Sequence, residues 1–513
     1  MDKDIDKVEK ETSSSVNNLG KVNKKTKKQS KSDKALHTLE PFAKIKTPFW
    51  KVDEAKDIFG MAVPIFVQLL FSVLISQINL VAINHYKDGS YAEASAKAIL
   101  AYNTLQFIPS LIATGTIIVS GNLIGQGRKD EVSKVVVTGL LVNLAIMVTI
   151  FTFVEIFSDQ IVKLVEANDG KPIRDLATGE ILETNELTYV STYYRFTNMY
   201  LVSMSVFQVF VAGLQAFKKS KIVTIGTICA NVLDLVLISI ILYATNIPPV
   251  YSALVWFCTG VFQIVFMMVM NFKYINFKIN RGNQISKIFA IETLRTGLPI
   301  TIEMGVWNLC NFGTTTAISR LVPSGADNSW IVLHRNANSI GQYSQAFIQA
   351  IGTVTAVFVS RKIGERDKQG AYEIAINCWK AAIYATLAAN ILMMAASYPV
   401  LELLGSQGKS WPWGVILLAV FSIKILFDTV NMTLLRALWS VGDLWYPIFV
   451  SFITMGIGMV ALPYIVVSGL RIMEGWGLIF IYVGIIADPL MRSVVYFFRW
   501  TKGKWQKYIH IVE

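Results

Sequence analysis

The chain has 513 residues, of which 53% are hydrophobic and only 16% are charged. Soluble globular chains carry roughly 25% charged residues, so the composition excludes a water-soluble protein of this length. Apolar runs recur along the sequence, and a helix of about 20 apolar residues crosses the hydrocarbon core of a bilayer. We therefore expect an all-α polytopic membrane protein, because backbone polar groups in lipid must be bonded within their own segment.

Composition and motifs also exclude several classes of function. The sequence contains no H-E-x-x-H, G-x-S-x-G or nucleotide-binding glycine loop and only four histidines, so we expect neither an enzyme nor a bound cofactor. Four cysteines without paired spacing predict neither a disulfide nor a zinc site. The net charge of +12 is explained by where the lysines lie, so we expect no nucleic-acid partner.

Residues 1–48 are polar and contain no apolar stretch. Between residues 21 and 34 there are seven lysines and one acid, which predicts a disordered basic tail on the cytoplasmic side, beside an anionic membrane surface. No cleavable signal peptide is visible, because the tail lacks an apolar segment followed by small residues. The tail either only helps to set the membrane topology or also has a regulatory role.

Twelve apolar spans follow the tail, and an even number places both termini on one side. They fall into an N-terminal lobe of six helices at 49–283 and a C-terminal lobe of six helices at 284–513. The predicted spans are 57–86, 94–126, 131–157, 188–217, 221–246, 249–272, 292–322, 330–362, 370–398, 411–440, 443–467 and 475–499.

The charges of the loops predict the orientation, because Lys and Arg in short loops collect on the cytoplasmic side. With the tail inside, the inside loops hold basic clusters at 128–134, 218–221, 273–287, 361–368 and 502–507. The outside insertion at 158–187 carries seven acids against three basic residues and is expected to form a small hairpin or an irregular cap. We therefore predict a multi-pass protein of the cell membrane with both termini in the cytoplasm.

The two halves of the chain repeat one another. The stretch GTIIVSGNLIGQGRKDE at 115–131 has a second version, GTVTAVFVSRKIGERDK, at 352–368. Upstream, Pro64 and Pro299 each stand in the first apolar helix of a half, within PIFVQ and PITIE. A chain that repeats itself in this way consists of two similar units, so we expect pseudo-symmetric bundles.

Six segments resemble the multidrug and toxic compound extrusion (MATE) transporters of the multidrug/oligosaccharidyl-lipid/polysaccharide flippase superfamily, and their order covers nearly the whole chain after residue 50. They are VPIFVQLLFSVLISQINLVAINHY, GTIIVSGNLIGQGRKDE, ICANVLDLVLIS, GLPITIEMG, FDTVNMTLLRALWSVGD and YFFRWTKGKW. The resemblance implies two lobes that form a V around a cavity opening alternately to each side, which is also the behaviour expected of duplicated carriers.

The resemblance further implies export of bulky, amphipathic and often cationic small molecules, driven by inward flow of protons or sodium ions. The chain would act in the lipid bilayer, as a monomer, with the coupling ion in place of a cofactor. The alternative is a flippase for a phospholipid or a lipid-linked saccharide, for which Arg195, Arg320, Arg335 and Lys424 could hold an anionic head group. Twelve spans favour the exporter, because such flippases often have fourteen.

Acids within the spans are the predicted coupling residues, because an ionisable group in hydrocarbon needs a site or a partner. Asp234 matches the family's acid in the fifth helix, whose loading is thought to bend the first helix at Pro64, and Pro299 holds the equivalent place in the second lobe. The family's first-helix aspartate falls on Gln77, which cannot titrate. Asp428 aligns with the family's tenth-helix acid, and Glu303 lies one turn before its seventh-helix acid.

Two pairs at four-residue spacing lie on single helix faces, Lys424 with Asp428 and Asp488 with Arg492. The first pair is either an ion pair that only allows both charges to be buried, or a switch. In the switch, a proton or a sodium ion takes Asp428 while Lys424 turns to Glu303 or to substrate. A lysine so close repels sodium, so sodium at Asp428 is the less favoured reading. The second pair is expected to be structural.

Amides within the spans predict a wet, polar cavity, with one tryptophan available to stack on a flat cation. Such amides either bond neighbouring helices, at about 1 kcal/mol per bond, or line the cavity. The predicted cavity residues are Gln68, Gln77, Asn79, Asn103, Gln208, Asn231, Trp307, Asn308, Asn311, Gln342 and Asn431.

Overall fold

The computed structural model describes residues 48, 50–165, 167–175, 177–275, 285–321, 329–403 and 409–512. Apart from its last position, the predicted tail at 1–48 lies outside the described residues, and so does the predicted lobe boundary at 283/284.

The first half of the chain is helical except for one hairpin. Its helices are α2 (Ala55–His85), α3 (Ala92–Asn103), α4 (Ser110–Gly125), α5 (Val132–Leu164), α6 (Glu186–Ala216), α7 (Ser220–Ser239) and α8 (Ser252–Tyr274). Short helical turns lie at η1 (Tyr86–Gly89), η2 (Lys129–Glu131), η3 (Ile240–Ala244) and η4 (Pro249–Tyr251), and the hairpin consists of β1 (Ile173–Arg174) and β2 (Ile181–Glu183).

The second half is helical throughout its described residues. Its helices are α9 (Lys287–Ser319), α10 (Ser329–Gly364), α11 (Lys368–Ala395), α12 (Ser397–Leu403), α13 (Val415–Val441), α14 (Trp445–Met455), α15 (Leu462–Tyr464) and α16 (Glu474–Thr501). Short helical turns lie at η5 (Ser410–Gly414), η6 (Gly456–Ala461), η7 (Ile465–Gly469) and η8 (Lys504–Tyr508).

Ten helical stretches of the described chain are long and apolar enough to cross a membrane, and the shorter apolar helix α4 joins them. The α9 helix is long enough to span, but asparagines and threonines in its second half lower its mean hydropathy. Together with α9 and the α3–α4 pair, these stretches account for the twelve predicted spans. The all-α polytopic membrane fold is therefore confirmed.

One predicted span is not a single helix. The span predicted at 94–126 consists of α3 and α4, separated by a turn at 104–109 that ends in Pro109. Proline provides no backbone N–H, and its ring opposes a continuous helix. Buried Asn143 of α5 donates to the carbonyl oxygen of Pro109 at 3.1 Å and to that of Ser205 at 2.9 Å. A neighbouring helix thus satisfies a carbonyl at the break, as a membrane interior requires.

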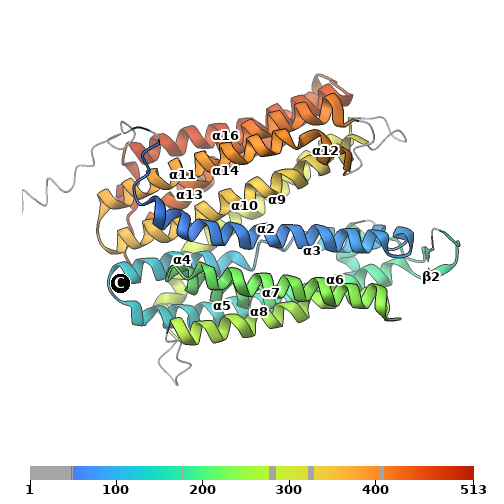
Figure 1. The fold of residues 1–513 in the computed structure, drawn as a ribbon, viewed down its shortest axis with the longest axis horizontal. Helices are drawn as coiled ribbons and strands as arrows, with labels where there is room; N and C mark the ends of the chain where they lie inside the picture. The colour runs from blue at the N-terminus through green and yellow to red at the C-terminus, as the bar shows by residue number, and fades with distance from the viewer. Residues whose placement is uncertain are drawn as a thin grey trace, which may run out of the picture.

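The helices form two bundles that lie side by side (Figure 1). Helices α2 to α8 form the lower bundle of that view and α9 to α16 the upper one; we call them the N-lobe and the C-lobe. The bundles come together at the end that carries the last described residues and diverge toward the end that carries β2.

The hydrophobic cores follow the same division. At the β2 end, one core contains only residues of the N-lobe and another only residues of the C-lobe. At the opposite end, two further cores mix the lobes: Ile58 and Ile118 pack with helices of the C-lobe, and Phe289 packs with helices of the N-lobe. Among the described residues, the cores that mix the two lobes therefore lie at one end.

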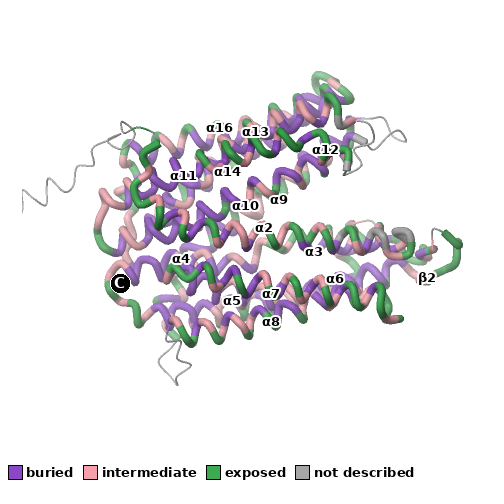
Figure 2. Tube along the Cα trace, in the orientation of Figure 1, coloured by how far each residue is buried: buried purple, intermediate pink, exposed green. Residues whose placement is uncertain are grey.

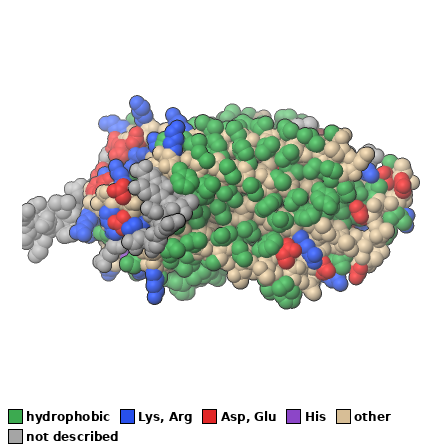
Figure 3. All heavy atoms as spheres, turned by 90° about the horizontal axis from the view of Figure 1, so that it is seen from below, with side chains coloured by type: hydrophobic (Ala, Val, Ile, Leu, Met, Phe, Trp, Pro, Cys, Tyr) green, Lys and Arg blue, Asp and Glu red, His purple; other side chains and the backbone are tan. Residues whose placement is uncertain are grey.

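The surface is arranged as a bilayer requires. Figure 3 shows hydrophobic side chains over the middle of one face, with Lys and Arg gathered at one end. The outward positions of α5, α7 and α8 include Leu141, Val148, Val232 and Val265, all exposed and apolar. Helices α6 and α10 lie deeper, with long buried stretches in Figure 2, and 78% of the most apolar window of α10 is buried.

The outside insertion contains the hairpin that the sequence predicts as one of two possibilities. Strands β1 and β2 pair antiparallel. The insertion is shorter than 158–187, because α5 continues to Leu164 and α6 begins at Glu186. Lys97 of α3 bonds Glu186 at 2.6 Å, and Lys171 lies 3.3 Å from Glu93. These pairs fasten the insertion to α3, so it belongs to the N-lobe.

Candidate functional site

The lobes meet through glycines at the end where the basic loops lie, which we call the basic end. A Cβ atom on Gly125, the last residue of α4, would lie 2.0 Å from the carbonyl oxygen of Arg361 on α10. A Cβ atom on Gly364, the last residue of α10, would lie 2.0 Å from the carbonyl oxygen of Asn122 on α4. Each glycine thus meets the residue three positions before the other, as a pseudo-twofold relation demands. Only glycine permits this close approach of backbones.

A second glycine pair joins α4 to α9. A Cβ atom on Gly115 would lie 2.3 Å from the carbonyl oxygen of Thr293, and one on Gly297 would lie 2.0 Å from that of Leu111. The repeated GTIIVSGNLIG segment is therefore an interface between the lobes, which explains why the chain has glycines at positions that are unfavourable for a helix.

Polar contacts close the basic end further. Lys218 of the N-lobe bonds Asp57 at 3.1 Å, and its ammonium lies 4.3 Å from the ring centroid of Phe358 in the C-lobe. The guanidinium of Arg361 donates to the carbonyl oxygen of Ala216 across the lobes at 2.9 Å. These contacts hold the two lobes together in the conformation described here.

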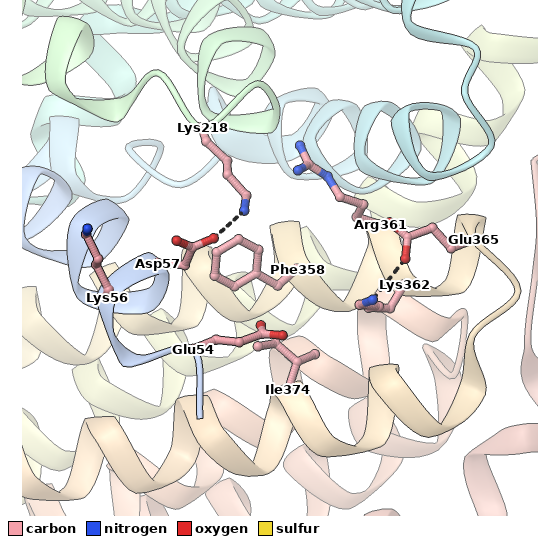
Figure 4. A pocket seen from close by; sticks show the side chains of 9 residues that line it. All are labelled: Glu54, Lys56, Asp57, Lys218, Phe358, Arg361, Lys362, Glu365 and Ile374. Carbon is pink, nitrogen blue, oxygen red and sulfur yellow. Dashed lines mark hydrogen bonds and ion pairs between the residues drawn. The ribbon is translucent and has the colours of Figure 1, made fainter. Parts of the chain in front are cut away.

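A cavity of about 420 Å³ lies between the lobes at this end (Figure 4). Figure 4 shows Lys218 reaching toward Asp57 and Lys362 toward Glu365, with acids and bases mixed around it. It contains none of the predicted cavity residues, so it is a feature of the closed interface. Its lining residues are Glu54, Lys56, Asp57, Lys218, Phe358, Arg361, Lys362, Glu365 and Ile374.

The last described segment of the chain crosses the same end. The backbone N–H of Val512 donates to the side-chain oxygen of Asn122 at 3.2 Å, and its carbonyl oxygen accepts from Gln126 at 2.7 Å. His510 bonds Glu292 of α9 at 2.7 Å. Trp505 and Trp500 are fully buried and stacked at 4.6 Å. The segment that follows α16 in the C-lobe therefore ends on α4 of the N-lobe.

Asp234 is buried within the N-lobe on α7. Its Oδ2 atom accepts a hydrogen bond from Asn79 of α2, while its Oδ1 atom has no partner. Asn79 bonds this acid, whereas Gln77, on which the family's first-helix aspartate falls, lies two residues earlier on α2. Both residues are amides, so the side chain that bonds Asp234 cannot titrate.

Gln77 instead makes a contact between the lobes. Its side-chain oxygen accepts from the hydroxyl of Tyr343 on α10 at 2.6 Å. Nearer the basic end, the rings of Phe66 on α2 and Phe347 on α10 lie 5.4 Å apart, edge to face. The α2 and α10 helices thus form one side of the boundary between the lobes.

Asp428 lies on α13 in the C-lobe and is held by two partners. Its Oδ2 atom accepts from Lys424 at 2.5 Å and from Gln345 of α10 at 3.0 Å. The ion pair at four-residue spacing is therefore present, as the sequence predicts. Because the Lys424 ammonium holds this carboxylate, sodium binding at Asp428 would require its displacement.

Each acid bonds one of the two helices that meet at the boundary between the lobes. Asp234 bonds Asn79, which is two residues from Gln77 on α2; Gln77 bonds Tyr343, which is two residues from Gln345 on α10; and Gln345 bonds Asp428. Residues two apart on a helix point to different faces, so these are three separate bonds that meet on the helix pair α2–α10. Sequence patterns could not reveal them, since they join residues far apart in the chain.

In the conformation described here Lys424 bonds Asp428, and its turn toward Glu303 stays a prediction, since Glu303 has other partners. The Oε1 atom of Glu303 accepts from Ser451 of α14 at 2.6 Å and from Arg492 of α16 at 3.4 Å. Arg492 also binds Asp488, so a pair expected to be purely local extends to a third residue on another helix. The sequence showed only the four-residue spacing within α16.

The prolines predicted to bend helices both lie inside them, Pro64 in α2 and Pro299 in α9. The carbonyl oxygen of Pro64 accepts from the hydroxyl of Thr224 on α7 at 2.6 Å. Since proline removes a rung of the helical ladder, each first helix of a lobe has a weakened point. In α9 this point lies one turn before Glu303.

A polar stripe on α10 supports a wet surface between the lobes. Exposed residues on α5, α7 and α8 are mostly apolar, whereas the exposed positions along α10 are Arg335, near its start, and Gln342 and Gln349, in its middle. Exposed amides at this spacing on an otherwise buried helix are unsuited to lipid and suited to water.

The other predicted cavity residues have mixed environments. Asn231 reaches Ser72 at 3.5 Å, whereas Asn308 bonds the carbonyl oxygen of its own helix at 3.0 Å. Trp307 is 44% exposed and available for stacking. The remainder divides into buried Gln68 and Asn431, half-buried Gln208 and Asn311, and exposed Asn103.

Comparisons with known proteins agree with this architecture. The MatE family model matches residues 64–240 and 299–464, one range in each bundle, and together these ranges span more than half of the chain. The chain is 21% identical to the uncharacterized transporter YisQ of Bacillus subtilis (strain 168) over 461 residues, covering 88% of this chain and 95% of that protein. It is 22% identical to the probable multidrug resistance protein NorM of Thermotoga maritima over 218 residues, covering 42% and 45% of the two chains.

Solved structures share the fold. A transporter of the MOP superfamily from Pyrococcus furiosus superposes with a TM-score of 0.76 at 15% identity, covering 88% of this chain and 96% of that one. At this level of identity the likeness concerns the arrangement of helices alone.

Proposed function

This chain belongs to the MATE family of membrane transporters, and we propose that it is a secondary active exporter of amphipathic, cationic small molecules. It moves them by alternating access in exchange for protons or sodium ions. As a member of a transporter family it is not an enzyme.

The observation that carries this proposal is the placement of Asp234 and Asp428 beside the helices α2 and α10. Each lobe holds a carboxylate within its span, and each carboxylate bonds one of the two helices that meet at the boundary. The Gln77–Tyr343 bond then joins those helices. A cation that neutralises either acid weakens its hydrogen bonds and so changes the packing of α2 against α10, which is the coupling that an antiporter needs.

The substrate class follows from the surface between the lobes. Amides of the α10 stripe provide hydrogen bonds without a fixed charge, and Trp307 offers a partly exposed ring for a flat cation. These features suit an organic cation with an apolar body.

Protons are the favoured coupling ion in the C-lobe. The ammonium of Lys424 lies 2.5 Å from Asp428 and repels sodium, whereas a proton can join the carboxylate without a set of oxygen ligands. In the N-lobe, Asp234 Oδ1 and Asn79 Oδ1 are both without donors, so two oxygen atoms are available to either cation.

The predicted orientation places the basic end in the cytoplasm of a cell whose plasma membrane holds the chain. Basic loops collect on that side, and both described ends of the chain lie there. The conformation closed at the basic end is then the one that faces outward. Each lobe has its own core and the lobes complete the site together, so one chain suffices for transport.

The test is efflux of a fluorescent organic cation from liposomes that contain the purified chain, with pH and sodium gradients varied independently. We expect one of the gradients to drive efflux. Asp234→Asn and Asp428→Asn reduce the gradient-driven stimulation roughly 5- to 150-fold, corresponding to a coupling free energy of ~1–3 kcal/mol. The matched control is Asp130→Asn, the same change on an exposed loop of the basic end.

Efflux that ignores both gradients, or variants that export as well as the control, would contradict the proposal. Movement of a labelled lipid between leaflets without dye efflux would favour the flippase instead. Three of the four candidate head-group ligands of that alternative are engaged within the protein, whereas Arg335 is exposed on α10. Arg195 donates to Ser158 at 2.7 Å, Lys424 binds Asp428, and Arg320 lies over the ring of Tyr464 at 5.2 Å.

A further inference from the structure

A buried charge cluster in the C-lobe involves three helices. Glu303 comes from α9, Asp488 and Arg492 from α16, and Ser451 and Thr454 from α14. All five residues are at most 5% exposed. Charges sealed in this way are costly in a membrane and mark function unless they are fully paired.

The pairing within this cluster is incomplete. One guanidinium serves two carboxylates: Arg492 contacts Asp488 closely, but lies 3.4 Å from Glu303. The Oε2 atom of Glu303 and the Nε atom of Arg492 are buried without a hydrogen-bond partner. Asp428, by contrast, has a lysine of its own at 2.5 Å. Of these three acids, Glu303 is therefore the one held least firmly by a counter-charge.

We propose that Asp488 and Arg492 belong to the coupling machinery of the C-lobe, in which Arg492 is a tethered counter-ion that Glu303 exchanges for the incoming cation. This inference rests on the proposed function. In the conformation described here, Arg492 bridges both carboxylates. When a proton joins a carboxylate oxygen of Glu303, or a sodium ion binds there, Arg492 withdraws from Glu303 and stays on Asp488.

Asp488 keeps Arg492 paired during the exchange. Without it, a buried arginine released from Glu303 would have no partner and would be strongly destabilising. Thr454 donates to Asp488 at 2.7 Å and Ser451 donates to Glu303 at 2.6 Å. These two donors lie one turn apart on α14. The α14 helix thus contacts both carboxylates and responds to how Arg492 is shared between them.

The cluster is also connected to the closed interface. Gly297, whose Cα packs against the backbone of Leu111 in the N-lobe, lies six residues before Glu303 on the same helix. Between them is Pro299, where the helical ladder of α9 lacks a rung. Release of Glu303 therefore acts on a helix that can bend just before it reaches the contact between the lobes.

Other titratable groups surround the cluster. Arg436 of α13 lies within electrostatic range of Glu303 without a hydrogen bond to it, and Asp428 of α13 lies within range of Arg492. Tyr496 of α16 shares the hydroxyl of Ser451 at 2.9 Å. Cys310 of α9 lies within range of Asp488. Arg436 is thus a second base near Glu303, but its guanidinium is held over the ring of Trp439, at 5.1 Å.

The experiment measures two quantities on the full chain. The first is the infrared band of the protonated Glu303 carboxyl group, which is identified because Glu303→Gln removes it. The second is efflux of a fluorescent organic cation from liposomes. Both are measured across a pH series, with and without sodium. In Arg492→Gln we expect the midpoint of the band and the midpoint of the efflux profile to move together toward higher pH, by about one unit or more, because a neighbouring positive charge has been removed.

Two further variants separate coupling from structural pairing. Arg492→Lys restores most of the parental midpoint, because the charge returns. The neutral pair Asp488→Asn with Arg492→Gln leaves no unpaired charge on α16 but still lacks the counter-ion of Glu303, so its midpoint stays shifted. The matched control is Asp443→Asn with Arg499→Gln, which removes the buried ion pair between Arg499 of α16 and Asp443 of the turn before α14 and keeps the parental midpoint.

The inference would be overturned if the double variant Asp488→Asn with Arg492→Gln had the same carboxyl-band midpoint and efflux midpoint as the control. It would also be overturned if the carboxyl band shifted in pH while the efflux profile did not. If Arg492→Gln does not fold, Arg492→Lys and the neutral pair still decide the matter. If the parent chain shows no gradient-driven efflux, the exporter proposal is wrong, and this inference, which rests on it, is wrong as well. The infrared band still reports the protonation of Glu303 in that case.

Discussion

Replacing Gly364 by alanine places a methyl group in the interface between the lobes. The new Cβ would lie 2.0 Å from the carbonyl oxygen of Asn122 and 2.9 Å from its carbonyl carbon, and both belong to backbone that cannot rotate away. In the α2 helix, Gly60 is a matched control, because a Cβ there meets nothing within 4 Å. Alanine favours a helix over glycine by about 1 kcal/mol at both sites.

The difference between the two variants isolates the contact between the lobes. Overpacking of this kind costs ~1–3 kcal/mol, and it destabilises only the conformation in which α4 and α10 touch. The ratio of closed to open conformations at the basic end should therefore fall roughly 5- to 150-fold in Gly364→Ala. In Gly60→Ala the ratio should not change.

Distances between spin labels on the two lobes measure this ratio. Leu164 and Leu470 are exposed labelling positions near the diverging ends of the lobes, once the four native cysteines are replaced. We expect Gly364→Ala to add a second, shorter distance that Gly60→Ala lacks. Identical distributions in both variants would refute the close approach of α4 and α10.

Two further predictions concern single contacts. Tyr343→Phe removes the donor to Gln77 and so a hydrogen bond worth ~0.5–1.5 kcal/mol. The efflux rate at a fixed gradient should therefore change by roughly two- to twelvefold. An unchanged rate would show that this bond does not contribute to coupling. The pKa of Asp175 lies below its ordinary value because the N–H groups of Ala177 and Thr178 bond its carboxylate. The turn that begins at Asp175 is therefore stabilised at neutral pH and loosens as the pH falls through the lowered pKa. Amide hydrogen exchange would detect this loosening.

Much of the fold was predictable because its causes are local. Apolar length specifies spans, the four-residue spacing of Lys424 and Asp428 specifies a pair, and the repeated glycine segment indicates like halves. The break between α3 and α4 was missed, since the hydropathy of 94–126 is continuous across it and only Pro109 signals the turn.

The candidate site was less predictable because its bonds join distant helices. The register of α2 against α7 decides that Asn79 rather than Gln77 faces Asp234, and sequence spacing does not determine that register. For the same reason the contact between Glu303 and Arg492 was missed. Arg492 lies 189 residues away in the chain and reaches Glu303 only through the packing of α9 against α14 and α16.

The most direct measurement of cation exchange is the ion flux that a substrate gradient itself drives. Liposomes containing the chain would be given an outwardly directed gradient of the organic cation and no gradient of pH or sodium, and internal pH and sodium would be recorded. Exchange predicts that one of these ions moves inward as the dye leaves, and that Asp234→Asn abolishes this movement. Dye that leaves with no opposing cation flux would contradict it.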